Sequence, residues 1–454
     1  GECGRGVSRL KIVRGVEESK IVLSVDRGIN LDTVPAHVQA TTERVFGEPL
    51  TPQRTVEKIL ASVKSEGDSA IRRLAKAIEG VELGEFEVAK AEIKSSYDAV
   101  DRSVIDALEM SAERVEKYHR SAKPESWMSF DEGYGGLVVP CEKVGAYVPG
   151  GTAPLPSTVL MSAIPAKVAG VREVLVCTPP TSTGKPEAVT LVASDIAGVD
   201  RVFGVGGAQA IGAMTYGTET IPSVDIICGP GNIFVTLAKK QVYGEVGIDG
   251  LYGPTETLIV ADETANPTLC AADLLAQAEH DVLARPVLVT TSEALADQVN
   301  LEIETRLARL SRESVARPAI ENRAVIAIVD SLDEAMELAN WFAPEHLCLM
   351  VPDPWSWVSS VRNAGIVFLG EFSHEVLGDY VAGPSHVMPT GGTARFNSGL
   401  GIHSFVKIMP VVALSNEVSS QIAAGASAIA RAEGLTAHAE AAEIREEILG
   451  DPQG

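Results

Sequence analysis

The residues best suited to chemistry in this sequence are histidines that stand close to an amide or a carboxylate. Gln277-Ala-Glu-His280 places an amide and an imidazole three residues apart, and residues three apart share one face of a helix. Amide oxygen and imidazole nitrogen can both bind zinc, although glutamine is an unusual ligand. Taken alone, such a pair belongs more often to an ordinary helix surface than to a metal site.

A second candidate is Pro344-Glu345-His346, just before a predicted strand at 347–351. Adjacent residues in an extended chain point in opposite directions, but on a loop they can flank one substrate as separate proton-transfer groups. Histidine suits general acid–base work near neutral pH. Further polar candidates are Asp379, His386, Glu433 and His438. No H-E-x-x-H motif is present, and the candidate zinc ligands, which are far apart in the chain, fit a site assembled between domains or subunits.

Two glycine-rich turns, at 204–207 and 229–232, each follow a predicted strand and precede a predicted helix. Backbone N–H groups in such a turn can bind an anion at the helix N-terminus, and Asn232 is placed to cap its helix. The first turn lacks the third glycine of G-x-G-x-x-G because Gln209 stands there. Neither turn ends in Gly-Lys-Ser/Thr, which argues against ATP chemistry. Similar turns occur in any α/β fold.

The elements that must position these residues alternate between strand and helix. Strands are predicted at 144–148, 171–177, 202–203, 224–228, 257–261, 286–290, 324–329, 347–351 and 366–369. Helices are predicted at 52–80, 93–118, 157–169, 189–197, 208–214, 232–242, 267–281 and 292–310, and in the tail from about 415. Residues 1–45 have no strong period. The alternation predicts an α/β fold in which helices cover both faces of parallel sheets.

The bulk composition excludes several classes of function. The 454 residues suggest two or three domains, and the 45% hydrophobic content supplies buried cores. The formal net charge of −23 opposes binding to nucleic acids and anionic membranes. No apolar run approaches the roughly 18 residues that span a membrane, and no signal peptide is evident. Six scattered cysteines without a C-x-x-C pair indicate reduced thiols. We expect a cytoplasmic protein.

Eight ordered motifs make this chain resemble the histidinol dehydrogenase family, over about residues 45 to 445. They are Tyr147-Val-Pro-Gly-Gly-Thr-Ala-Pro-Leu-Pro-Ser157-Thr-Val-Leu-Met, Val205-Gly-Gly-Ala-Gln209-Ala, Gly229-Pro-Gly-Asn232, Gly253-Pro-Thr255-Glu, Gln277-Ala-Glu-His280, Pro344-Glu345-His346, Gly378-Asp379-Tyr380 and Glu433-Gly-Leu-Thr-Ala-His438. Each is a weak signal alone, but together in this order they are far more specific.

The resemblance implies a zinc-dependent, NAD-linked oxidoreductase that converts L-histidinol through L-histidinal to L-histidine. His346 corresponds to the general base and Glu345 to the group that activates water. The residues that correspond to zinc ligands are Gln277, His280, Asp379 and His438, the last supplied across a homodimer. The residues that correspond to NAD contacts are Tyr147, Gln209 and Asn232. The substrate contacts are Thr255, His346, Glu433 and the zinc ligands.

The resemblance also implies two Rossmann-like domains, one inserted in the other, with extended helical terminal segments. We expect an N-terminal segment at 1–44 and a domain formed by 45–146 plus 255–400, which carries most of the zinc and base residues. The inserted NAD-contacting domain is expected at 147–254. Residues 401–454 are expected to form a helical segment that crosses to the partner subunit.

Some positions depart from the common family pattern. Thr255 stands where serine is usual, Ser385 where asparagine is frequent, and Leu251-Tyr252 and Ile402-His403-Ser404 also differ. These differences leave open a zinc- and NAD-dependent dehydrogenase of the same family that acts on another primary alcohol, such as a sulfonated diol. A zinc hydrolase that uses no nicotinamide and a non-catalytic homologue are the remaining alternatives.

Overall fold

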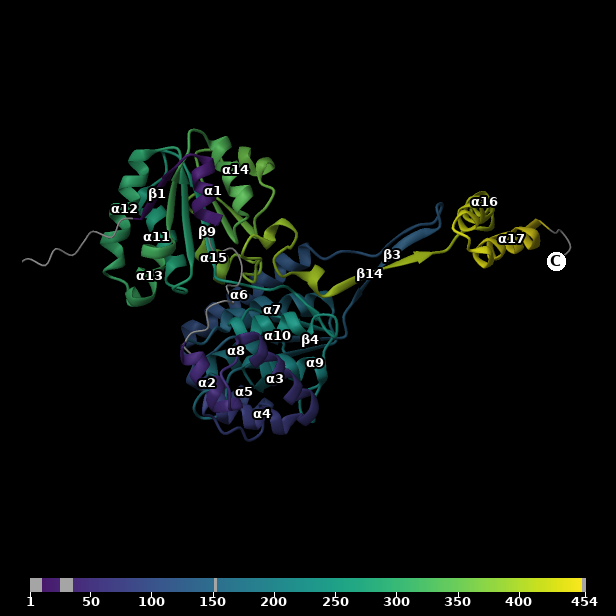
Figure 1. Cartoon of the computed structure of the whole chain (residues 1–454), viewed down its shortest axis with the longest axis horizontal. Coiled ribbons are helices and arrows are strands. Elements are labelled where there is room, and N and C mark those ends of the chain that lie inside the picture. Colours follow the sequence, from purple (N-terminus) through teal and green to yellow (C-terminus); the bar gives the residue numbers. More distant parts are fainter. Residues whose placement is uncertain (1–9, 25–35, 151–152, 451–454) are drawn as a thin grey trace, which may run out of the picture. The chain divides into compact units, whose positions relative to one another are not determined.

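The computed structural model describes residues 10–24, 36–150 and 153–450 (Figure 1). The chain divides into two compact units. Unit 1 contains the residues up to Ala122 and those from Cys141 to Phe405, and unit 2 contains Lys123–Pro140 and the residues from Val406 onward. In the described part of the chain, no helix is both long enough and apolar enough to cross a membrane.

Unit 1 contains a six-stranded parallel sheet in the order β1-β11-β10-β9-β12-β13. Its strands are β1 (Lys11–Arg14), β9 (Glu256–Ala261), β10 (Arg285–Thr290), β11 (Val325–Ile328), β12 (His346–Met350) and β13 (Ile366–Leu369). The helices of this region are α1 (Val16–Ser24), α11 (Pro267–Ala278), α12 (Glu293–Leu307), α13 (Glu313–Arg323), α14 (Leu332–Phe342) and α15 (Glu375–Tyr380).

Alternate residues of each central strand enter different cores. Ile259 of β9 packs in the core with α11, α12 and α13, whereas Leu258 and Val260 pack in the core with α1 and α14 (Figure 1). Because side chains alternate along a strand, a strand that is apolar throughout fills both faces of a sheet. This explains why residues 258–261 of β9 and 286–289 of β10 are unbroken apolar runs.

Unit 1 also contains a five-stranded parallel sheet in the order β6-β5-β4-β7-β8. Its strands are β4 (Lys143–Tyr147), β5 (Glu173–Thr178), β6 (Arg201–Gly204), β7 (Ile226–Cys228) and β8 (Gly247–Ile248). The connecting helices are α7 (Pro156–Ala169), α8 (Ala188–Ile196), α9 (Gly207–Tyr216) and α10 (Ile233–Val242). The preceding elements are α2 (Ala36–Phe46), α3 (Pro52–Glu66), α4 (Asp68–Leu74), the π-helical turn η1 (Ala75–Glu79), α5 (Lys90–Ser95), η2 (Ser96–Ala99) and α6 (Arg102–Ser121).

Unit 2 consists of an antiparallel sheet and a helix pair. The sheet has the order β14-β3-β2, from β14 (Val406–Val412), β3 (Tyr134–Pro140) and β2 (Trp127–Ser129). The pair is α16 (Asn416–Ala432) and α17 (Thr436–Gly450), which are joined by an ion pair of 2.6 Å between Arg431 and Glu443. Short 3₁₀ turns complete unit 1 at η3 (Pro354–Ser360), η4 (Thr393–Arg395) and η5 (Ile402–Ser404).

The expected α/β fold with parallel sheets is confirmed, and several expected helix boundaries are corrected. The helix expected at 52–80 is interrupted at Gly67, whose φ of 57° and ψ of −132° are not helical. The helix expected at 93–118 is interrupted at Val100, which is extended. The helix expected at 267–281 ends at Ala278. Part of the segment without a strong period forms β1, because β1 gains its ladder from β11, more than 300 residues later.

Candidate functional site

Glu345 and His346 lie at the amino end of β12, and both are buried. The chain reaches them through Ala343, which ends α14 in the left-handed region at a φ of 54°. Among the described residues no other non-glycine residue has a positive φ, and such strain is concentrated at functional sites. Carboxylate and imidazole lie on the same side of the chain turn, because Glu345 Oε2 is 3.7 Å from His346 Nδ1.

The imidazole of His346 is held at one nitrogen and open at the other. Nδ1 is 2.9 Å from the backbone oxygen of Glu256. Nε2 lies 3.6 Å from Asp379 Oδ1, and it makes no hydrogen bond within the described part of the chain. Burial disfavours the charged ring, but the carboxylates of Glu375, Glu345 and Asp379 together outweigh it and raise the pKa of His346 well above its ordinary value.

The carboxylate of Glu345 receives two hydrogen bonds at one oxygen. Thr255 Oγ1 donates to Oε2 at 2.6 Å, and the backbone N–H of Glu256 donates to the same oxygen at 3.0 Å. Burial raises the pKa of Glu345, although the charge of His346 and the hydrogen bond from Thr255 act in the opposite direction. Thr255, expected at the substrate, therefore supports one of the two expected catalytic groups.

Gln277 is buried on α11, beside residues of β9. With its amide nitrogen facing Thr257 Oγ1 and Glu375, its oxygen lies 3.0 Å from the backbone nitrogen of Glu256, so it shares that N–H with Glu345. Glu375 is a group that the sequence analysis missed. It stands four residues before Asp379 on α15, a spacing that puts two carboxylates on one helical face. Burial raises its pKa to about 8.

Asp379 stands between two histidines. Its Oδ2 is 4.0 Å from His280 Nε2, and its Oδ1 faces His346. Burial alone would raise the pKa of Asp379, yet the imidazoles around it hold that pKa below its ordinary value. A further histidine that lies here is His386, whose Nδ1 is 2.8 Å from the backbone oxygen of Asp379 and whose Nε2 is 3.2 Å from Thr158 Oγ1.

The expected helical pairing of Gln277 with His280 is corrected by the end of α11. The helix stops at Ala278, with Glu279 as its C-cap, so His280 lies in the following turn. The side chain of His280 is 48% exposed, whereas Gln277 is fully buried. The two side chains therefore do not project from one helical face, and of the two only His280 has a contact with Asp379 within the described residues.

Within the described residues, no group of three or more His, Cys, Asp or Glu side chains lies close enough to hold a metal ion. The donors that do lie together in unit 1 are the imidazole of His280 and the carboxylate of Asp379, whereas the amide of Gln277 contacts Thr257 and Glu375. The two remaining expected residues belong to unit 2. Glu433 is the C-cap of α16, His438 lies in α17, and both are exposed.

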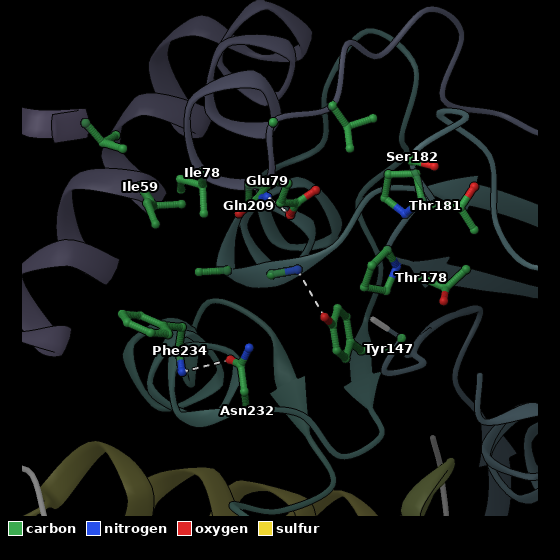
Figure 2. Close-up of a pocket in the computed structure, with 18 of the residues that line it drawn as sticks. Ile59, Ile78, Glu79, Tyr147, Thr178, Thr181, Ser182, Gln209, Asn232 and Phe234 are labelled. Carbon is green, nitrogen blue, oxygen red and sulfur yellow. Dashed lines mark hydrogen bonds between the residues drawn. The ribbon is translucent and has the colours of Figure 1, made fainter. Parts of the chain in front are cut away.

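The three expected NAD contacts line one cavity of about 840 Å³ (Figure 2). Tyr147 ends β4, and its hydroxyl accepts from the backbone N–H of Gly207 at 3.0 Å. Gln209 lies on α9, and its Nε2 donates to Glu79 at 2.9 Å. Asn232 caps α10 as expected, because its Oδ1 accepts from the N–H groups of Phe234 and Val235.

The wall of this cavity has both apolar and hydroxyl-bearing side chains. Ile59, Ile78 and Phe234 supply apolar surface, and Thr178, Thr181 and Ser182 supply hydroxyl groups (Figure 2). The N-terminus of α9, at Gly207 and Ala208, also opens on it. The cavity can thus take a ligand that combines flat apolar rings with hydroxyl and anionic groups.

Comparisons with known proteins show one family over most of the chain. A family model described as histidinol dehydrogenase matches residues 48–446. The histidinol dehydrogenase of Dehalococcoides mccartyi is 49% identical over 397 residues, which cover 87% of this chain and 91% of the relative. That of Deinococcus radiodurans is 47% identical over 440 residues, with coverage of 96% and 100%. The crystal structure of histidinol dehydrogenase from Elizabethkingia anophelis matches with a TM-score of 0.90 at 34% identity, with coverage of 97% and 99%.

Proposed function

This chain belongs to the histidinol dehydrogenase family of oxidoreductases, and we propose that it oxidises L-histidinol through L-histidinal to L-histidine with NAD as hydride acceptor. The observation that carries the proposal is the pair Glu345–His346. Its two side chains are buried 3.7 Å apart, each is held by a separate hydrogen bond, and one imidazole nitrogen is left open. Two successive oxidations need two proton acceptors of this kind.

In the first step His346 accepts the proton of the substrate alcohol at Nε2. The carbonyl of Glu256 can only accept a hydrogen bond, so in the neutral ring, which is the reacting form, Nδ1 carries the proton and Nε2 has the lone pair. The neighbouring carboxylates that raise the pKa of His346 stabilise the imidazolium once the proton has arrived. The base is thereby strengthened without any movement of the ring.

In the second step Glu345 takes a proton from water as it adds to the aldehyde. Its raised pKa makes it a better base than an exposed carboxylate. The hydrogen bonds from Thr255 and from the N–H of Glu256 hold Oε2, so the other oxygen is free to face the water. Burial of the site keeps the reactive aldehyde from leaking into solvent.

The residues present fit a zinc ion. The side chains that would hold it are Gln277, His280 and Asp379, together with His438 of the partner subunit. Zinc binds nitrogen and oxygen donors of these kinds. Nε2 of His346, which is buried and makes no hydrogen bond within the described residues, lies 3.6 Å from the carboxylate of Asp379. When bound, zinc supplies a positive charge that anchors and orients the imidazole and amine of the substrate. Glu433 of the partner subunit would complete the substrate site.

The proposed NAD site is the cavity lined by Tyr147, Gln209 and Asn232. In the proposed architecture, residues 147–254 form an inserted Rossmann-like domain that contains β5, β6, β7 and β8 of the five-stranded sheet. Residues 45–146 plus 255–400 form the second domain, and β4 ends at the boundary between the two. Residues 1–44 and 401–454 are terminal segments, and the latter crosses to the partner in a homodimer. The substrate is a small molecule, and neither nucleic acid nor membrane is a partner. The described cysteines are buried and form no disulfide bond with one another, which supports a reducing, cytoplasmic location.

The proposal is tested by NADH absorbance with L-histidinol as substrate. We expect two NADH for each histidinol oxidised, loss of the activity after treatment with a chelator, and its recovery on addition of zinc. The folded, zinc-loaded protein could instead form no NADH from histidinol and oxidise another primary alcohol, such as a sulfonated diol. In that case the same mechanism would apply to that alcohol as substrate. A protein that binds no nicotinamide nucleotide would contradict the dehydrogenase mechanism.

A further inference from the structure

The cavity assigned to the dinucleotide contains carboxylates but no basic side chain. Among its described lining residues, Glu79 and Glu187 are the carboxylates, and none is Lys, Arg or His. Sites that accept the extra ribose phosphate of NADP commonly place an arginine beside it, whereas sites for NAD place a carboxylate on the ribose hydroxyl groups. The charge of this cavity therefore matches a dinucleotide without that phosphate.

Glu79 reaches the cavity through unusual backbone geometry. It is the last residue of η1, a π-helical turn that directly follows α4 and ends at Gly80, whose φ is 72°. Turns of this type are rare in proteins, and those that do occur are often found at functional sites. One carboxylate oxygen of Glu79 accepts from Gln209 Nε2 at 2.9 Å, and the other makes no hydrogen bond within the described part of the chain. Figure 2 shows Glu79 and Gln209 side by side in the cavity wall.

The carboxylate of Glu79 is incompletely compensated in the protein alone. Burial raises its pKa, and only the amide of Gln209 acts in the opposite direction. No cation among the described residues pairs with it. A partly buried carboxylate with one open oxygen is stabilised when a ligand donates hydroxyl groups to it, and it repels a ligand that brings a phosphate instead.

The position of Glu79 in the cavity indicates which end of the dinucleotide would lie beside it. Asn232 lies at the start of α10, and one turn later Thr236 donates to the backbone oxygen of Tyr252, three residues before Thr255. The side of the cavity that carries Asn232 is therefore the side connected to Thr255 and the proposed catalytic groups. Glu79 lies across the cavity from Asn232 (Figure 2). Beside Glu79, Ile78 and Ile59 offer apolar surface suited to an adenine ring.

We propose that Glu79 binds the 2′- and 3′-hydroxyl groups of the adenosine ribose and makes this enzyme selective for NAD over NADP. The inference rests on the proposed function, because it assumes that the cavity holds the dinucleotide. It assigns Glu79 to specificity, since the carboxylate contacts the cofactor far from the transferred hydride.

The test compares Glu79→Gln, Glu79→Asp and wild type in two assays. The first is the ratio of kcat/KM for NAD to kcat/KM for NADP with histidinol. The second is direct titration with adenosine 5′-monophosphate and with adenosine 2′,5′-bisphosphate, which needs no turnover. Glu79→Gln should lower both selectivity ratios by about 10-fold or more, because one charge repulsion is removed. The change should lie in KM more than in kcat. Glu79→Asp keeps the charge and should keep most of the selectivity.

Glu82→Gln is the matched control, because Glu82 is an exposed carboxylate three residues away that pairs with Lys76 and does not line the cavity. If folded Glu79→Gln loses affinity equally for both nucleotides, Glu79 serves only to position Gln209, and the inference is overturned. Wild type that binds neither nucleotide would overturn it together with the cavity assignment. Wild type that binds the monophosphate selectively but oxidises no histidinol would remove only the proposed substrate.

Discussion

Lys239 and Asp249 form an ion pair that is almost wholly withdrawn from solvent. Nζ lies 2.5 Å from Oδ1, and the exposed fractions of the two side chains are 2% and 0%. Nζ also donates to the backbone oxygen of Gly229 at 2.9 Å, and Asp249 Oδ2 accepts from the N–H of Gly229 at 2.8 Å. The pair therefore connects the turn at Gly229, just before Asn232, to the segment that runs from Asp249 to Thr255.

Removal of one partner of this pair should destabilise the protein strongly. Lys239→Met leaves a buried carboxylate without its cation, and such a change costs about 3–5 kcal/mol of the free energy of unfolding. The double variant Lys239→Met/Asp249→Asn should lose less than either single variant. Lys240→Met is the control, because Lys240 is the exposed neighbour on the same helix. Denaturant titration measures all four proteins, and a loss below about 1 kcal/mol for Lys239→Met would contradict the argument.

His346→Asn should separate catalysis from binding. Asparagine cannot accept a proton, so we expect kcat to fall by roughly 10²–10⁴-fold, the usual contribution of a general base. Zinc content and histidinol affinity should stay near those of wild type. His403→Asn is a control, because His403 is an exposed histidine outside the site. Unchanged turnover of His346→Asn would remove His346 from the mechanism.

His438→Ala should lose bound metal while the protein keeps its fold. The imidazole is exposed on α17, so its loss removes the proposed ligand and no core packing. Metal analysis after gel filtration and light scattering of the same sample measure zinc content and subunit number together. Glu440→Ala, an exposed change two residues away, should retain both. Full zinc content in His438→Ala would exclude His438 from the metal site.

Thr255 should matter through its hydroxyl group. Thr255→Ser keeps the hydrogen bond to Glu345, and its kcat should stay within about threefold of wild type. Thr255→Val removes a hydrogen bond to a charged group, worth about 1.5–3 kcal/mol, so turnover should fall by about 10-fold or more. Because the proposed mechanism assigns Glu345 to the hydration step, histidinal oxidation should suffer more than histidinol oxidation in rapid-mixing assays. Equal effects in both steps would argue against that assignment.

His119 should make the protein less stable in mild acid. Burial, with a smaller contribution from His403, lowers the pKa of His119 to about 4 from an ordinary 6.5. Between these values the unfolded chain binds a proton that the folded chain refuses. Its contribution to stability is therefore present above pH 6.5 and is lost as pH falls toward 4. The slope is at most about 1.4 kcal/mol per pH unit. Unfolding of His119→Asn over this range should show a flatter pH dependence, and a parallel curve would refute the assignment.

Local features of the sequence were predictable because their causes are local. The apolar runs of β9, β10 and β12 and the turns between them predicted strands within a few residues of those observed. Asn232 was predicted as a cap from its place before an apolar helix, and its hydrogen bonds agree. The motif order around Glu345 and His346 indicated the family. Side-chain period, capping and turn chemistry act over a few residues, so one sequence displays them directly.

Only the tertiary structure decided which edges of the sheets carry the site. Tyr147, Gly207 and Asn232 follow the carboxyl ends of β4, β6 and β7, where ligands of parallel sheets usually bind. Thr255 and Glu345, in contrast, precede the amino ends of β9 and β12. Glu79 and Glu375 acquired their surroundings in the same way, from elements more than a hundred residues away. Burial and charge at such positions depend on which distant segments pack together, and no local pattern records that pairing.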